Sequence, residues 1–169
     1  MKQLWAPWRM QYIQGREPEP GCLFCTKIRQ SDDEANLIVY RGEHCFVMLN
    51  LYPYNSGHLM VVPYQHTGAF QDVRPEVGAA LFSTAQHSMR VLGDVMHPEG
   101  FNLGINQGVI SGAGVPDHIH VHIVPRWGGD TNFMPVLADA KVMPEVLGAT
   151  AAKLRPGFAE LEQSEEPSG

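Results

Sequence analysis

Residues 118–125, HIHVHIVP, carry the sequence pattern from which the fold of this chain can be predicted. Successive side chains of a β-strand leave opposite faces of a sheet, so we expect His118, His120 and His122 to share one face. The apolar residues beside them suit the opposite, core-facing side: Ile119, Val121 and Ile123. Three imidazoles on one face indicate a bound metal or a reacting ligand. A partly solvated strand that happens to be rich in histidine is the alternative.

Around this strand, at 118–124, the sequence predicts an antiparallel sheet of about five strands packed with one long helix and a C-terminal helix, an α+β fold. Short apolar runs between turn residues predict the other strands at 37–41, 45–49, 57–63 and 101–106. Apolar residues spaced by three or four predict the long helix over 73–95. Proline suits a first turn and ends a helix, so we expect the last helix to begin at Pro144 and end near Arg155.

The chain of 169 residues has the length of one domain. We expect a single domain over 1–169, with an N-terminal arm at 1–21, a core at 22–135, and a C-terminal helix with an acidic tail at 136–169. The net charge of −6 argues against a broad nucleic-acid interface, which needs clustered basic residues.

The N-terminal segment lacks the apolar stretch of a secretory signal, and the sequence has no apolar run of about 18 residues that could span a membrane. The three cysteines are an odd number in a chain without an export signal, so disulfides are not expected. These features predict a cytoplasmic protein that does not associate with membranes.

A glycine-rich segment at 106–114 leads towards the histidines. Gly108, Gly112 and Gly114 allow a backbone tight enough to present N–H groups to an anion, and Ser111 adds a hydroxyl. A simple turn is the alternative. The position of the segment directly before the histidines favours a phosphate-binding loop.

Cys22 and Cys25 are separated by two residues, a spacing at which two thiolates can bind one metal ion. The sequence has no second pair of this kind, so further ligands would come from distant histidines. A redox pair is one alternative, although no βαβ pattern surrounds the cysteines. Two buried free cysteines are the other.

Residues 118–124 resemble the signature of the histidine-triad (HIT) superfamily of nucleotide hydrolases and transferases, in which three histidines alternate with apolar residues. Residues 50–63 resemble the family's ribose-binding asparagine and the histidine-containing strand that follows it. Residues 106–114 resemble its phosphate-binding loop. The resemblance implies a HIT-like fold.

Two further segments, 4–10 and 125–133, resemble a bacterial branch of the family that contains diadenosine tetraphosphate (Ap4A) phosphorylases. In all, the resemblance covers about residues 4 to 135. The branch implies an enzyme that cleaves dinucleoside polyphosphates such as Ap4A.

The resemblance also implies the roles of the site residues. His120 would be the nucleophile that forms a nucleotidyl-histidine intermediate, because neutral imidazole is a competent nucleophile near pH 7. His122 and His58 would contact the transferring phosphate, and His118 completes the catalytic set. The residues expected to bind nucleotide or phosphate are Asn50, Asn106, Gln107, Gly112, Ala113, Gly114 and Trp127.

Alternatives stand beside two of these assignments. Asn50 also suits an ordinary turn before Pro53, and Trp127 also suits the edge of the core instead of the second nucleoside. For the metal, the resemblance implies that His66 and His118 complete a Cys₂His₂ set suited to structural zinc. No organic cofactor is expected.

The branch favours inorganic phosphate over water as the acceptor for the nucleotidyl group, which would make the chain a phosphorylase or adenylyltransferase acting on adenine nucleotides. An Ap4A hydrolase and a purine nucleoside phosphoramidase are the enzymatic alternatives, and a nucleotide-binding sensor is the alternative without turnover. The acidic balance argues against action on nucleic acid. The family implies a homodimer, for which the apolar residues within 134–154 offer a contact surface.

Overall fold

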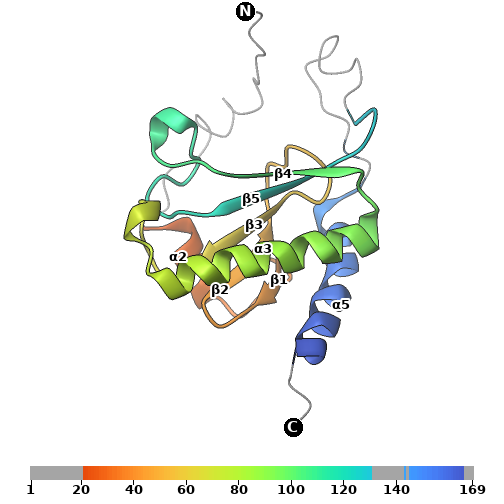
Figure 1. Cartoon of the computed structure of the whole chain (residues 1–169), viewed down its shortest axis with the longest axis horizontal. Coiled ribbons are helices and arrows are strands. Elements are labelled where there is room, and N and C mark those ends of the chain that lie inside the picture. Colours follow the sequence, from red (N-terminus) through yellow and green to blue (C-terminus); the bar gives the residue numbers. More distant parts are fainter. Residues whose placement is uncertain (1–20, 131–142, 144, 166–169) are drawn as a thin grey trace, which may run out of the picture.

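The computed structural model of the chain describes residues 21–130, 143 and 145–165, in which five strands form one antiparallel sheet (Figure 1). The strands lie in the order β1-β2-β3-β5-β4 across the sheet. Their bounds are β1 Ile38–Arg41, β2 Cys45–Leu49, β3 Leu59–Pro63, β4 Gly100–Ile105 and β5 Val121–Arg126. The predicted α+β class is confirmed.

Helices pack on both faces of this sheet. The α-helices are α2 Leu23–Arg29, α3 Pro75–Met96 and α5 Leu147–Glu165, and the short 3₁₀ helices are η1 Phe70–Asp72 and η2 Val109–Ser111. Figure 1 shows α3 crossing the front of the sheet, with α5 beside it. Among the described residues, no helix has both the length and the apolar character needed to cross a membrane.

The main core lies between the sheet and the helices α3 and α5. Pro75 begins α3, where the missing N–H costs little, and the buried residues of this helix recur every three or four positions. The core joins them to alternate strand residues and to one stripe of α5: Val47, Leu49, Leu59, Val61, Leu81, Ala85, Leu92, Val121, Ile123, Ala151, Leu154 and Phe158. Val121 and Ile123 of the histidine-rich segment therefore lie in this core as predicted, and Ile119 is buried as well.

The opposite face of the sheet carries the functional residues. Met48, Met60, His122 and Gly104 lie directly opposite one another on successive strands, and residues in such register share a face. Phe24 of α2 packs against Met48 and Met60. Helix α2 therefore covers the β1–β3 half of this face.

The C-terminal helix differs from the prediction, because α5 begins at Leu147 and continues through Pro156 to Glu165. Pro144 lies outside the described residues. Ala151, Leu154 and Phe158 are buried on both sides of the proline, and Arg155 Nε donates to the carbonyl of Ile38 at 3.2 Å. Tertiary packing thus outweighs the local cost of a helical proline.

The histidine-rich strand also begins later than predicted. The ladder of β5 starts at Val121, and His118 and His120 precede it. Ile119 N–H donates instead to the carbonyl of Thr67 at 2.7 Å, so this part of the chain is held by the segment after β3. Helix α2 was not predicted, because its 7 residues are too few to show a helical period.

Candidate active site and metal centre

His58 and His122 form a hydrogen-bonded pair at the centre of the candidate active site. His58 is fully buried, and its Nδ1 accepts the backbone N–H of Tyr54 at 3.0 Å. Since a backbone N–H can only donate, the proton of neutral His58 lies on Nε2, which is 3.0 Å from His122 Nδ1. His122 then carries its own proton on Nε2, the nitrogen suited to donate to a phosphate oxygen.

His120 has the opposite tautomer. Its Nδ1 donates to the carbonyl of His118 at 2.9 Å, which leaves Nε2 with the lone pair. His120 is buried, and this burial lowers the pKa of its imidazole, partly offset by the hydrogen bond to the His118 carbonyl. A buried, neutral imidazole with an available Nε2 is competent as a nucleophile.

His120 and His122 line a hollow that we call the Phe24 hollow. Most of its wall is apolar or aromatic, as is common for small-molecule sites. The lining residues are Leu23, Phe24, Lys27, Met48, Asn50, Leu51, Tyr52, Tyr54, Met60, Gly112, Gly114, Val115, His120 and His122. The hollow therefore combines a surface suited to a nucleoside with the two histidines suited to its phosphate.

His122 also lines a second hollow on its other side, which we call the Arg126 hollow. Most of the residues that line it have polar side chains, and they come from β4, β5, the segments that follow these strands, and the segment between β2 and β3. The lining residues are Tyr54, Asn55, Asn102, Leu103, Gly104, Asn106, His122, Val124, Arg126 and Asp130. The two hollows meet at His122 and Tyr54.

The glycine-rich segment contributes to the Phe24 hollow through Gly112 and Gly114. Gly112 has a φ of 84°, in the left-handed region that favours glycine. Ala113 N–H donates to the carbonyl of Gly108 at 3.4 Å, within the loop. Gln107 lies outside both hollows, because its Oε1 accepts the N–H of Phe70 at 2.8 Å.

The other predicted nucleotide-binding residues have distinct positions. Asn50 lines the Phe24 hollow, and its Oδ1 also accepts the N–H of Tyr52 at 2.9 Å, so it forms a turn and faces the site at once. Asn106 lines the Arg126 hollow. Trp127 lines neither, since its indole N–H donates to the carbonyl of His97 at 3.1 Å.

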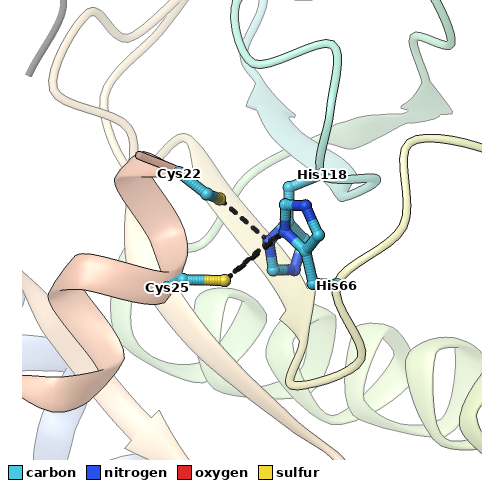
Figure 2. A group of neighbouring side chains, drawn as sticks. All are labelled: Cys22, Cys25, His66 and His118. Carbon is cyan, nitrogen blue, oxygen red and sulfur yellow. Dashed lines mark hydrogen bonds between the residues drawn. The ribbon is translucent and has the colours of Figure 1, made fainter. Parts of the chain in front are cut away.

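The first triad histidine belongs to a different cluster. Figure 2 shows Cys22, directly before α2, and Cys25, in its first turn, pointing towards His66 and His118. Cys22 Sγ lies 3.2 Å from His118 Nδ1, and Cys25 Sγ lies 3.4 Å from His66 Nδ1. The four residues predicted as a Cys₂His₂ set therefore lie together, and His118 belongs to this cluster.

The cluster has the dimensions of a tetrahedral metal site. All four candidate ligand atoms lie within 4.8 Å of one another, and the two imidazole nitrogens are 3.3 Å apart. Zinc–sulfur and zinc–nitrogen bonds at tetrahedral angles require separations of roughly 3.3–3.8 Å between ligand atoms. The donor set and its spacing therefore fit zinc.

His118 is oriented for this role by a backbone carbonyl. Its Nε2 donates to Pro63 at 2.8 Å, so Nδ1 keeps the lone pair and faces the sulfurs. Burial lowers the pKa of His118, which keeps the imidazole neutral, as a metal ligand must be. Burial and the neighbouring Cys22 thiol raise the pKa of Cys25, a cost that a bound cation would relieve.

Sequence reasoning missed the residues that connect these features. The Phe24 ring meets the rings of His118 and His120 edge-on, with centroids 5.4 and 5.0 Å apart. Tyr54 lines both hollows and its N–H sets the tautomer of His58. The position of Phe24 between the two cysteines is the signal that could have identified it.

Comparison with known proteins agrees with this geometry. The family model described as HIT domain matches residues 32–129. A Mycobacterium tuberculosis (strain CDC 1551 / Oshkosh) protein named AP-4-A phosphorylase is 41% identical over 167 residues, covering 94% of this chain and 85% of the relative. A Schizosaccharomyces pombe asymmetrical bis(5'-nucleosyl)-tetraphosphatase is 33% identical over 93 residues, or 55% of this chain and 50% of the relative.

A solved structure, that of a zinc-bound histidine triad family protein from Mycobacterium smegmatis, matches with a TM-score of 0.69 and 29% identity, covering 86% of this chain and 98% of that one. The family match spans more than half of the chain and includes the histidine-rich segment. The chain therefore belongs to the HIT domain family.

Proposed function

We propose that this chain is a HIT enzyme that cleaves dinucleoside polyphosphates such as Ap4A through a nucleotide bound covalently to His120. The observation that carries the proposal is the hydrogen bond from His120 Nδ1 to the His118 carbonyl, which leaves Nε2 as the nucleophile in the wall of the Phe24 hollow. The 41% identity to a protein named AP-4-A phosphorylase supports the substrate class.

The reaction proceeds in two displacements at the same phosphorus. In the first, the Nε2 lone pair of His120 attacks the α-phosphorus of Ap4A. The bond from that phosphorus to the bridging oxygen breaks, and ATP leaves with the electron pair. In the second, an oxygen of HPO₄²⁻ attacks the phosphorus, the P–N electrons return to Nε2, and ADP leaves with the proton of the phosphate.

The other residues bind and orient the substrate. Asn50 and the apolar wall of the Phe24 hollow hold the nucleoside, and the loop of Gly112, Ala113 and Gly114, two of whose residues line this hollow, remains the predicted phosphate contact. His58 fixes the ring of His122, whose Nε2–H then donates to the oxygens on which charge develops. Gln107, Asn106 and Trp127 remain predicted contacts of the remainder of the substrate.

We also propose that Cys22, Cys25, His66 and His118 hold a structural zinc ion, which supplies a fixed tetrahedral link between α2 and the histidine-rich segment. The separations of the ligand atoms support this role. The zinc-bound histidine triad protein of similar fold is consistent with it. With its four positions filled by protein, such an ion takes no part in the displacement.

Three wider expectations also remain proposals. We propose that the chain is one HIT domain with the arm, core and tail already outlined, that it acts in the cytoplasm, and that it forms a homodimer. Much of the apolar segment suggested for the dimer, including Val136, Leu137 and Val142, lies outside the described residues. Val146 is 75% exposed, which supports its availability for contact.

Product analysis tests the proposed function. Purified protein is incubated with Ap4A, with and without inorganic phosphate, and the nucleotides are separated by anion-exchange chromatography. ADP with ATP only in the presence of phosphate is the expected result. AMP with ATP in both conditions would instead identify a hydrolase, the activity named for the fission-yeast relative.

Mass spectrometry of the acid-labile adenylylated intermediate tests the nucleophile. The adduct should locate to His120 and be absent from His120→Ala. No turnover of Ap4A, combined with turnover of an adenosine phosphoramidate, would favour the phosphoramidase. Binding without turnover of either compound would leave the sensor as the surviving alternative.

A further inference from the structure

Apart from His122 and the predicted substrate contact Asn106, the residues of the Arg126 hollow have no part in the mechanism described so far. Arg126 follows His122 on the same strand at an even spacing, so both side chains leave the same face of the sheet. Asn102 lies opposite Val124 in the ladder between β4 and β5 and faces the same side. The hollow therefore contains an arginine and an asparagine side chain on the face of the sheet that carries His122.

Arg126 is held in place from two sides. Its Nε and Nη2 donate to the two carboxylate oxygens of Asp130 at 2.6 and 3.0 Å, and its Nη1 donates to Asn102 Oδ1 at 2.9 Å. The Asp130 side chain is only 9% exposed, and its Oδ2 also accepts Asn55 Nδ2 at 2.8 Å. The guanidinium plane is thus fixed before any ligand binds.

This arrangement leaves an edge of the guanidinium for a ligand. A guanidinium carries five N–H groups, and the described residues engage one on each of its three nitrogens. One N–H each on Nη1 and Nη2 remains for a ligand. Guanidinium N–H groups are suited to phosphate oxygens, and a fixed arginine loses little entropy on binding them.

The proposed reaction requires a phosphate site on the side of the phosphorus that faces away from His120 Nε2. Attacking and leaving groups at phosphorus lie roughly in line, so the leaving phosphate chain departs on the side opposite His120 Nε2. In the second displacement the acceptor enters along the path by which that chain left. One site beyond His122 would therefore serve the leaving phosphates first and the acceptor phosphate second.

Resting on the proposed function, we infer that the Arg126 hollow is the site of the leaving phosphate chain and of the inorganic phosphate that replaces it. Arg126 contacts the phosphate oxygens, and Asp130 is a positioning residue that acts through Arg126. The reaction remains balanced as written, because Arg126 keeps its protons and serves only to bind and orient the anion.

The test is a titration of inorganic phosphate at saturating Ap4A, with ADP formation measured for the wild type and for Arg126→Gln. Loss of the charged contact should raise the half-saturating phosphate concentration by about 10- to 100-fold. Arg126→Lys, which keeps a point charge without the fork, should fall between the two. Arg90→Gln is the matched control, because Arg90 is exposed on α3, across the sheet.

Asp130→Asn separates positioning from a structural role. It should raise the half-saturating phosphate concentration while kcat at saturating phosphate stays within about threefold of the wild type. A structural role alone would lower kcat and the melting temperature and leave the phosphate dependence unchanged, and this result would overturn the assignment of Asp130. Melting curves of all variants show which of them fold.

Two outcomes distinguish this inference from the proposed function. If the wild type shows saturable phosphate dependence and Arg126→Gln and Arg126→Lys share its half-saturation value, the phosphate site is wrong and the phosphorylase proposal stands. If the wild type forms AMP and ATP whatever the phosphate concentration, phosphorolysis fails and the acceptor site fails with it.

Discussion

His118 and His120 are separated by one residue, yet they belong to two sites with opposite requirements. His118 donates from Nε2 to the Pro63 carbonyl and directs Nδ1 to the cysteines, whereas His120 donates from Nδ1 to the His118 carbonyl and keeps Nε2 for a reacting phosphate. Both rings are buried. Each ring donates to a backbone carbonyl from one nitrogen, and the other nitrogen keeps its lone pair. The position of that carbonyl therefore decides whether the ring is suited to bind a metal or to attack phosphorus.

The two sites also share a wall. Phe24 lies between Cys22 and Cys25 in sequence and contacts the rings of both His118 and His120. A metal that fixes the cysteines would therefore fix one side of the Phe24 hollow as well. Substitutions on either side of Phe24 can separate the chemistry of the active site from the stability supplied by the metal centre.

The largest effect is expected at the nucleophile. His120→Ala should lower kcat by at least about 10⁴-fold, or about 5.5 kcal/mol, because no other group can form the covalent intermediate. Ap4A binding, measured by calorimetry, should persist, and the zinc content should remain unchanged. His97→Asn is the control, since His97 is exposed and has a left-handed backbone that asparagine also accepts. Full activity of His120→Ala would refute the nucleophile assignment.

The next effect is expected from metal removal. Chelation, or Cys22→Ser combined with Cys25→Ser, should lower the free energy of unfolding by about 4 kcal/mol relative to protein in zinc at a thousand times its dissociation constant. Thermal melting and metal analysis measure this loss. Cys45→Ala is the control for stoichiometry, because Cys45 lies near Thr84 in the main core. Unchanged metal content in the double variant would sink the zinc proposal.

A smaller effect is expected from the partner of His122. His58→Phe removes the hydrogen bond that orients His122 and should reduce kcat/KM by about 10- to 100-fold, the equivalent of about 1.5–3 kcal/mol. Steady-state kinetics with Ap4A measure the loss, and metal analysis should still find one zinc ion per chain. A matching loss of zinc would mean that the two sites are less independent than their geometry indicates.

The smallest effect is expected at Phe24, which contacts both the metal centre and the active site. Phe24→Leu keeps an apolar side chain but loses the aromatic contacts with both imidazoles, so the free energy of unfolding should fall by about 1 kcal/mol. Chemical denaturation measures this change, and kinetics should show a loss of about fivefold or less in kcat/KM, with zinc retained. Ile28→Leu, on the same helix, is the matched control. A large kinetic effect without a change in stability would assign Phe24 a direct role in binding.

Much of the fold could be predicted because local sequence patterns indicate where the strands and the long helix lie. Alternation marked the histidine-rich strand, short apolar runs marked the other strands, and the three-to-four spacing marked α3; the buried residues of β2, β3 and α3 agree with these patterns. Pro156 shows where such reasoning fails. Its local cost predicts the end of a helix, but the buried residues on either side and Arg155 keep α5 intact, and these contacts come from β1 and the core.

The sequence by itself determined the family, the sheet, and the residues that could react or bind a metal, because residue type and spacing of two are properties of the chain alone. The tertiary structure decided how the histidines were divided between sites. Carbonyls of Pro63 and His118 selected one nitrogen of each ring, and Asp130 with Asn102 fixed Arg126 beside His122. Pro63 and Asn102 are distant from His118 and Arg126 in sequence and are brought near them only by chain packing. Even the local partners, the His118 carbonyl and Asp130, need the folded backbone to come within the roughly 3 Å over which a hydrogen bond acts.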